Sequence, residues 1–188
     1  MDEVASSELI LGGQRSGKSR HAELLASQWL SSGLGRAIML ATAQPWDDEM
    51  KARIARHQAD RATRVPGMTT IEEPLHLAHV IALHSQPQTL IVVDCLTLWL
   101  TNLLMPVKKE LSLSDEEVNA QVGDLCNAVM QAKGPLAMVS NEIGLGLIPM
   151  GQEVRRFLDS HGRMNQHLAS VCQRVTLMVA GCSLRVKG

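Results

Sequence analysis

Residues 12–19, Gly-Gly-Gln-Arg-Ser-Gly-Lys-Ser, are of types that could bind the phosphates of a nucleotide. They match the pattern G-x-x-x-x-G-K-[ST], in which glycines let backbone N–H groups converge on phosphate oxygens. Lys18 would reach the β and γ phosphates, and Ser19 would offer its hydroxyl to Mg²⁺. The alternative is a chance glycine-rich turn, but a strand-like run precedes the motif and a helix-like run follows it. The sequence therefore predicts nucleotide binding, without saying which nucleotide or which reaction.

Asp94 is a second candidate for the metal site. Residues 89–93, Thr-Leu-Ile-Val-Val, are typical of a buried strand, and the carboxylate of Asp94 follows at its end. Many P-loop proteins hold Mg²⁺ through a carboxylate in this position. Asp94 could instead cap the helix that is expected to follow it. Both roles stay open, and they could coexist.

His57 could act as a nucleophile toward phosphorus. On a helix, Glu49, Arg53 and His57 are four residues apart and share one face, with Asp60 and Arg61 one turn further along. An imidazole is a competent nitrogen nucleophile, and neighbouring arginines can offset the charge of an attacked triphosphate. A histidine on a charged helix is, however, more often a solvated surface residue. The residues alone favour the solvated surface position over the catalytic role.

Short runs rich in Val and Ile alternate with longer amphipathic stretches, and the elements they predict must position these side chains. This alternation is typical of an α/β fold, and with the phosphate loop it predicts a RecA-like P-loop NTPase with a mostly parallel, doubly wound sheet and flanking helices. We expect strands at residues 8–11, 37–41, 69–72, 89–94, 136–140, 175–180 and 183–186. We expect helices at residues 18–30, 47–59, 74–84, 96–104, 115–132 and 152–173. Ser114 and Glu117 predict a capping box, and Pro74 suits a first helical turn.

The composition argues against nucleic acids and membranes as partners. Lys and Arg number 18 against 19 Asp and Glu, so the net charge of −1 offers no broad cationic surface. Aromatic residues make up 2%, too few for stacking platforms, and no apolar run approaches the length of a membrane span. Without a signal peptide or closely spaced cysteines, the chain is expected to be cytoplasmic. Its length predicts a single nucleotide-binding domain over residues 1–188.

Several blocks, taken together, resemble the adenosylcobinamide kinase and adenosylcobinamide-phosphate guanylyltransferase family. These blocks cover essentially the whole chain, and they are Gly12-Gly-Gln-Arg-Ser-Gly-Lys-Ser-Arg-His-Ala-Glu23, Ala41-Thr-Ala43, Asp47-Asp-Glu-Met-x-x-Arg-Ile-x-x-His57, Asp94-Cys-Leu-Thr-Leu-Trp-Leu-Thr-Asn-Leu-Leu104, Val139-Ser-Asn-Glu-Ile-Gly-Leu-Gly-Leu-Ile-Pro149 and Gly162-Arg-Met-Asn-Gln-His-Leu-Ala169. The chain departs from the family pattern at Met68, where Trp is expected, and at Arg56, where some members carry a second histidine. Neither departure removes a side chain that is proposed to take part in the chemistry.

The resemblance implies two activities in cobalamin biosynthesis. In the first, the γ-phosphate of ATP or GTP moves to the hydroxyl on the aminopropanol arm of adenosylcobinamide. In the second, His57 takes GMP from GTP and passes it to adenosylcobinamide phosphate, giving adenosylcobinamide-GDP. Lys18 and His57 would then be catalytic, with Mg²⁺ held by Ser19 and Asp94. The implied nucleotide contacts are Gly12, Gly13, Gln14, Arg15, Ser16, Gly17, Lys18, Ser19, Ala41, Thr42, Ala43, Gln58, Ala59, Asp60, Arg61, Glu72 and Asp94.

Two other functions compete with this one: a small-molecule kinase without a covalent step, and a RecA-like nucleotide-dependent assembly protein. Asn141 and Glu142 follow a predicted strand at the carboxyl edge of the sheet, where they could orient the corrinoid arm or the nucleotide, or simply form a turn. Arg163, Asn165 and Gln166 are similar, secondary candidates, which could instead be ordinary residues of a helix surface. The expected partners are the corrinoid substrates and nucleotides, and a homo-oligomer is expected because one small domain offers little concave surface for a large substrate.

Overall fold

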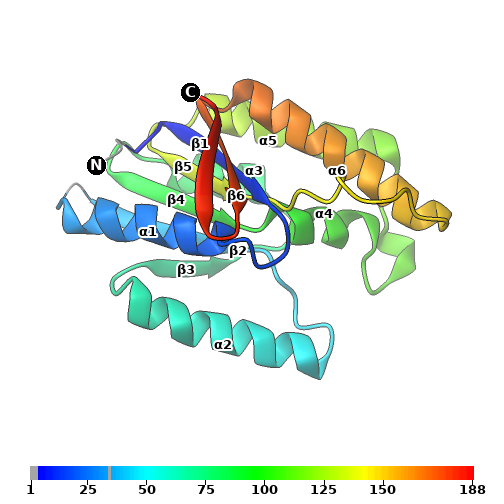
Figure 1. Cartoon of the computed structure of the whole chain (residues 1–188), viewed down its shortest axis with the longest axis horizontal. Coiled ribbons are helices and arrows are strands. Elements are labelled where there is room, and N and C mark those ends of the chain that lie inside the picture. Colours follow the sequence, from blue (N-terminus) through cyan, green and yellow to red (C-terminus); the bar gives the residue numbers. More distant parts are fainter. Residues whose placement is uncertain (1–3, 34) are drawn as a thin grey trace.

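A seven-stranded sheet runs through the middle of the molecule (Figure 1). The computed structural model describes residues 4–33 and 35–188. The strand order is β3-β2-β4-β5-β1-β6-β7, and every neighbouring pair is parallel except β6 and β7. The strands are β1 Ser7–Gly12, β2 Arg36–Ala41, β3 Thr69–Glu72, β4 Thr89–Asp94, β5 Leu136–Val139, β6 Arg174–Val179 and β7 Cys182–Lys187. The mostly parallel sheet predicted from the sequence is confirmed, with every strand end within one residue of its expected place.

The helices of the described chain are α1 Lys18–Ser31, α2 Asp48–Arg64, α3 Leu77–His84, α4 Leu96–Leu104, α5 Asp115–Met130 and α6 Gln152–Val171, with a short 3-10 helix, η1, at Lys109–Leu111. Two predicted bounds are wrong by more than two residues. The second helix continues to Arg64, whose guanidinium binds Glu23 of α1, instead of ending at residue 59. The third helix begins at Leu77 and not at Pro74, because the Glu73 carboxylate accepts hydrogen bonds from two backbone N–H groups in the turn before it.

The core consists of two apolar layers, one on each face of the sheet. On β4, Leu90 and Val92 belong to the layer that includes Ala22, Leu25 and Ala26 of α1. The alternate residues Ile91 and Val93 belong to the other layer, which residues of α3, α4, α5 and α6 complete. Such strands are buried on both faces, as parallel sheets generally are. Helix α2 lies outside this arrangement, beside the edge strand β3, and Arg61 is its one buried residue (Figure 1).

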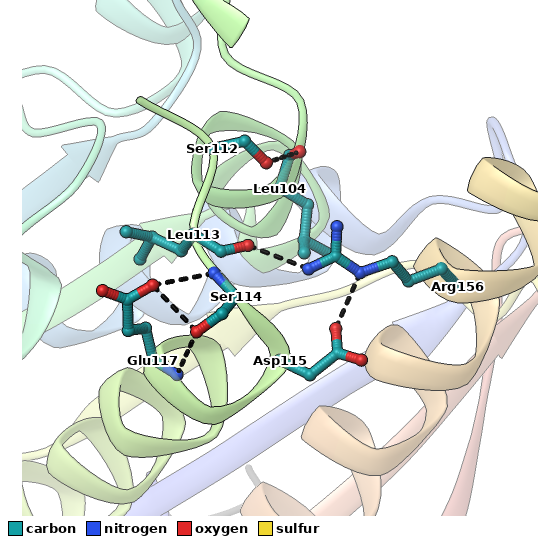
Figure 2. A network of polar contacts seen from close by, with 7 residues as sticks. All are labelled: Leu104, Ser112, Leu113, Ser114, Asp115, Glu117 and Arg156. Carbon is teal, nitrogen blue, oxygen red and sulfur yellow. Dashed lines mark hydrogen bonds and ion pairs between the residues drawn. The ribbon is translucent and has the colours of Figure 1, made fainter. Parts of the chain in front are cut away.

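Polar contacts join the connection after α4 to the starts of α5 and α6 (Figure 2). The predicted capping box is confirmed, since the Ser114 hydroxyl accepts from the Glu117 N–H and the Glu117 carboxylate accepts from the Ser114 N–H. Arg156 of α6 donates to Asp115 Oδ1 at 2.7 Å and to the Leu113 carbonyl at 2.9 Å. These contacts hold the first turns of α6 against the start of α5. No helix in the described part of the chain is long and apolar enough to cross a membrane.

Glu8 is a buried carboxylate near the start of β1, the strand that leads into the phosphate loop. Its Oε1 lies 3.3 Å from His21 Nε2 of α1 and accepts a 2.6 Å hydrogen bond from Thr176, while Arg174 Nη1 lies 3.6 Å from Oε2. Burial by itself raises the pKa of Glu8, but the hydrogen bonds from His21 and Thr176 and the charge of Arg174 outweigh it and lower the pKa. Glu8 therefore ties α1 and β6 to β1 as a carboxylate.

We predict that Glu8→Gln lowers the free energy of unfolding by roughly 3 kcal/mol at pH 7, because the partly buried Arg174 guanidinium loses its anion. A carboxylate with a lowered native pKa stabilises the fold above its unfolded pKa, and that contribution is lost as the pH falls through the native pKa. The difference between the variant and the parent protein should therefore shrink in acid. Urea unfolding at pH 7 and in acid measures it, and Glu110→Gln at an exposed site is the control, expected within about 0.5 kcal/mol of the parent protein. An equal difference in unfolding free energy between the variant and the parent protein at both pH values would contradict the stabilising role of the Glu8 carboxylate.

Candidate active site

The phosphate loop lies between the end of β1 and the start of α1, as the motif predicts. At Gly12, φ is 151° and an added Cβ would lie 2.5 Å from the carbonyl oxygen of Met178, so only glycine fits beside β6. Gly17, at the start of α1, has φ of 103°, in the left-handed region that glycine adopts without strain. The Gly181 N–H donates to the Ser16 carbonyl and supports the loop from the β6–β7 turn. The loop is thus held by β6 and by the turn that follows it.

The Lys18 side chain folds back over this loop. Its Nζ donates a 2.7 Å hydrogen bond to the Gly13 carbonyl, and the residue is only 7% exposed. Burial lowers the pKa of Lys18, although Cys95 and Asp94 act in the opposite direction. The Lys18 ammonium is poorly hydrated and is bound to one carbonyl. It would form stronger hydrogen bonds with the charged oxygens of a phosphate, because charge-assisted hydrogen bonds are roughly twice as strong as neutral ones. The Ser16 hydroxyl is also buried in the loop without a hydrogen-bond partner.

A cavity of about 110 Å³ opens beside the phosphate loop. Its walls come from α1, the end of β2, α2, β3, the end of β4 and α4. It is lined by Ser19, Ala41, Ala43, Met50, Arg53, Ile54, His57, Gln58, Arg61, Glu72, Asp94, Cys95 and Leu98. The hydroxyl and the carboxylate expected at a metal site, Ser19 and Asp94, therefore share one cavity with His57.

Most of the nucleotide contacts expected outside the phosphate loop lie in this cavity wall, but three do not. Thr42 is fully buried, and its hydroxyl binds the backbone N–H and carbonyl of Cys95, which joins the ends of β2 and β4. Ala59 is outside the cavity because α2 turns it away from the face that carries His57 and Arg61, and Asp60 does not line the cavity either. Asp60 binds Arg64 instead.

The apolar part of the lining was not expected from the sequence. Met50 and Ile54 of α2, and Leu98 of α4, surround the polar groups. Helical periodicity could have identified the first two, because positions 50, 53, 54, 57, 58 and 61 all lie on one face of a helix.

Polar contacts hold α2 against the body of the protein. Gln58 Nε2 donates to Glu72 Oε1 of β3 at 3.3 Å, and Arg61 Nη1 donates to the Thr70 hydroxyl at 3.2 Å. His57 is exposed, as expected for a solvated surface position. It also lines the cavity. The exposed imidazole is open to a ligand in the cavity.

The capping alternative for Asp94 is wrong. Cys95 occupies the capping position of α4, which has no side-chain cap hydrogen bond. Asp94 instead lines the cavity together with Ser19, and its charge offsets part of the lowering of the Lys18 pKa by burial. In the described part of the chain, no cluster of three or more His, Cys, Asp or Glu side chains could hold a metal by itself. The pair of Ser19 and Asp94 fits Mg²⁺, which typically takes one or two protein ligands and completes its shell with water and phosphate.

A buried polar network lies at the end of β5, beside the phosphate loop. Ser140 Oγ donates to Asn165 Oδ1 at 2.7 Å, Asn165 Nδ2 donates to the Asn141 carbonyl, and the Asn141 N–H donates to Thr97 Oγ1. His161 Nε2 lies 3.1 Å from Thr97 Oγ1 and 3.3 Å from Ser140 Oγ, and burial lowers the pKa of His161 to about 4. Of the secondary candidates, Asn165 thus holds Asn141 through its backbone.

Two other secondary candidates lie in different surroundings. The Glu142 N–H donates to the Gly12 carbonyl, which places Glu142 beside the phosphate loop. Arg163 lies on the exposed side of α6, near Asp159 and Gln166 and away from the cavity.

Comparison with known proteins identifies what the chain is similar to. Residues 8–186 match the family described as cobinamide kinase / cobinamide phosphate guanyltransferase. The bifunctional adenosylcobalamin biosynthesis protein CobP of Pseudomonas aeruginosa is 43% identical, over 96% of this chain and 97% of that protein. The bifunctional adenosylcobalamin biosynthesis protein CobU of Escherichia coli is 33% identical, over 95% of this chain and 98% of that protein.

Solved structures with the same fold are much more distant in sequence. One of them, an ATPase domain, superposes with a TM-score of 0.51 at 12% identity, covering 92% of this chain and 69% of that chain. The flagellar accessory protein FlaH from Methanocaldococcus jannaschii gives a TM-score of 0.53 at 10% identity, covering 98% of this chain and 79% of that chain. With the phosphate loop, these likenesses confirm the RecA-like P-loop fold and carry nothing beyond the fold.

We predict that Lys18→Ala weakens the binding of GTP and of ATP by at least tenfold, because each loses a charge-assisted contact to its phosphates. Equilibrium dialysis with each labelled nucleotide measures this. Lys51→Ala, which removes an exposed lysine paired with Asp48 on α2, is the matched control and should bind as the parent protein does. Unchanged binding in the Lys18 variant would show that the triphosphate lies elsewhere.

Proposed function

The chain belongs to the cobinamide kinase / cobinamide phosphate guanyltransferase family, and from that premise we propose that one cavity holds the nucleotide for both reactions. The protein is an enzyme of cobalamin biosynthesis with kinase and guanyltransferase activities. What remains to be assigned is which residues carry each step. The observation that carries the proposal is that Ser19, Asp94 and His57 line a single cavity beside the phosphate loop.

In the kinase step, the hydroxyl of the cobinamide aminopropanol arm attacks the γ-phosphorus of ATP or GTP. A bond forms between that oxygen and phosphorus, the bond to the β-phosphate oxygen breaks, and the nucleoside diphosphate leaves. Backbone N–H groups of the loop and the Lys18 ammonium bind the β and γ phosphates and stabilise the developing charge. Ser19 and Asp94 would hold Mg²⁺, which when bound neutralises charge on the phosphate oxygens.

In the transfer step, a ring nitrogen of His57 attacks the α-phosphorus of GTP. The nitrogen–phosphorus bond forms as the bond to the β-phosphate oxygen breaks, and pyrophosphate leaves. Arg53 and Arg61, which line the same cavity, offset the charge that develops on the α-phosphate. A phosphate oxygen of adenosylcobinamide phosphate then attacks the guanylyl-histidine and restores the imidazole, giving adenosylcobinamide-GDP. Because the transfer is divided into two displacements, the protein needs a nucleophile that holds the GMP group between them.

The covalent step distinguishes this proposal from a small-molecule kinase that has the same phosphate loop. Such a kinase has no use for an accessible imidazole flanked by two arginines, because phosphoryl transfer needs only positioning and charge stabilisation. The accessible His57 in the cavity wall supports the covalent route.

The proposed setting of the enzyme follows from its substrates. It would act as a single domain in the cytoplasm, where ATP and GTP are available and where its four cysteines, all unpaired in the structure, stay reduced. A homo-oligomer is proposed because one small domain offers little concave surface for a substrate as large as a corrinoid.

We predict that His57→Ala abolishes covalent labelling by α-labelled GTP and the guanyltransferase activity, yet keeps kinase activity within about tenfold of the parent protein. The variant removes the proposed nucleophile from an exposed position and leaves the phosphate loop and the core unchanged. Acid-labile label retained on denatured protein measures the covalent step, and phosphate transfer to adenosylcobinamide measures the other.

The matched control is His57→Asn, which keeps a polar side chain without a nucleophilic ring nitrogen and should behave as the alanine variant does. Free imidazole is expected to restore part of the transfer in His57→Ala by entering the vacated space. Labelling of His57→Ala at the rate of the parent protein would identify another residue as the nucleophile.

We predict that Asp94→Asn raises the Mg²⁺ concentration needed for half-maximal kinase activity by roughly tenfold or more, because the amide keeps the shape but loses the charge that attracts the cation. A Mg²⁺ titration at saturating ATP measures the shift. Asp48→Asn, an exposed carboxylate on α2, is the control and should titrate normally. An unaltered titration for Asp94→Asn would remove Asp94 from the metal shell.

A further inference from the structure

Residues 143–150, Ile-Gly-Leu-Gly-Leu-Ile-Pro-Met, expose large apolar side chains that the nucleotide chemistry does not use. Leu145 is 85% exposed, Leu147 98%, Ile148 83% and Met150 94%. Side chains of this kind are individually common at surfaces, but four within six residues form a cluster that usually marks a binding site. We call residues 143–150 the apolar segment.

Both ends of the apolar segment are anchored. At its start, Asn141 is held by Thr97 and Asn165, and the Glu142 N–H donates to the Gly12 carbonyl of the phosphate loop. At its far end, Arg155 of α6 donates hydrogen bonds to the carbonyls of Pro149 and Met150. The exposed side chains therefore project from a backbone fixed to the nucleotide site on one side and to α6 on the other.

The apolar segment lies at the edge of the sheet where the substrates must meet. Figure 1 shows the chain running from the end of β5 to the start of α6, at the end of the molecule that also holds the connection after α4. There, Leu104, Met105, Pro106, Ser112, Glu153, Arg156 and Phe157 line a hollow of about 390 Å³. Ligands of open α/β sheets bind outside the carboxyl ends of the strands, which is where this surface lies.

We propose that the apolar segment is the docking surface for the corrin ring of cobinamide, on which the ring lies while its aminopropanol arm reaches the phosphate loop. The inference rests on the proposed placement of the nucleotide in that loop. A corrin macrocycle presents methyl-bearing edges and neutral amides, and residues 143–150 contain no charged side chain. An added Cβ at Gly146 would meet no atom within 4 Å, so no other part of the protein covers the segment at this point.

The test is a full-length variant that carries Leu145→Ser, Leu147→Ser and Ile148→Ser. Its fold should be intact because these side chains make little contact with the core. We expect the Kd for adenosylcobinamide, followed by the corrin absorbance in equilibrium dialysis, to rise at least tenfold, with a similar rise in KM for both corrinoid substrates. The covalent labelling from GTP alone, which needs no corrinoid, should keep its rate.

The matched control is Leu83→Ser, an exposed leucine near the end of α3, at the opposite edge of the sheet from the phosphate loop, which should leave every value unchanged. An unchanged Kd for adenosylcobinamide in the triple variant would overturn the proposal. A fall in the sedimentation mass of the triple variant would overturn it too, because the surface would then join copies of the chain. Failure of the covalent proposal appears separately, as absence of label in the parent protein, and leaves the measurement of corrinoid binding intact.

Discussion

The site depends on the parallel pairing of the strands, because parallel strands deliver all their carboxyl ends to one edge of the sheet. β1 brings the phosphate loop to that edge, β4 brings Asp94, and β5 brings Asn141. The Thr42 hydroxyl binds both the N–H and the carbonyl of Cys95, so the ends of β2 and β4 are joined at the level of the cavity. These groups lie at the end of a buried strand or just beyond it, where the backbone leaves the sheet and side chains become accessible.

The two reactions take place at different phosphorus atoms of the triphosphate, so they require different groups at this edge of the sheet. The phosphate loop and Lys18 act on the β and γ phosphates and belong to the rigid part of the fold, packed between β1, β6 and α1. His57 belongs to α2, whose contacts with β3 and α1 are polar and whose one buried residue is Arg61. The nucleophile for the α-phosphate is therefore supplied from outside the core, by an element that adds chemistry to a common nucleotide-binding fold.

The sequence predicted the sheet closely because its central strands are short, apolar and bounded by turn residues. The phosphate loop and the position of Asp94 were predictable for a related reason, since both follow directly from where a strand ends. The errors in the bounds of α2 and α3 came from side-chain contacts that hydrophobic periodicity does not predict. Glu73 binds backbone N–H groups before α3 and delays its start, and Glu23 binds Arg64 in the last turn of α2. The sequence could not predict that His57 faces the same cavity as Ser19, because this placement depends on how α2 packs beside β3.

If one nucleotide site serves both reactions, its most direct test is the number of nucleotides bound per chain. A GTP analogue with a methylene group between the α and β phosphorus atoms cannot guanylylate His57, so its binding can be measured at equilibrium in the presence of Mg²⁺. A shared site predicts one analogue bound per chain and full displacement by ATP. Two analogues per chain, or an analogue that saturating ATP does not displace, would contradict it.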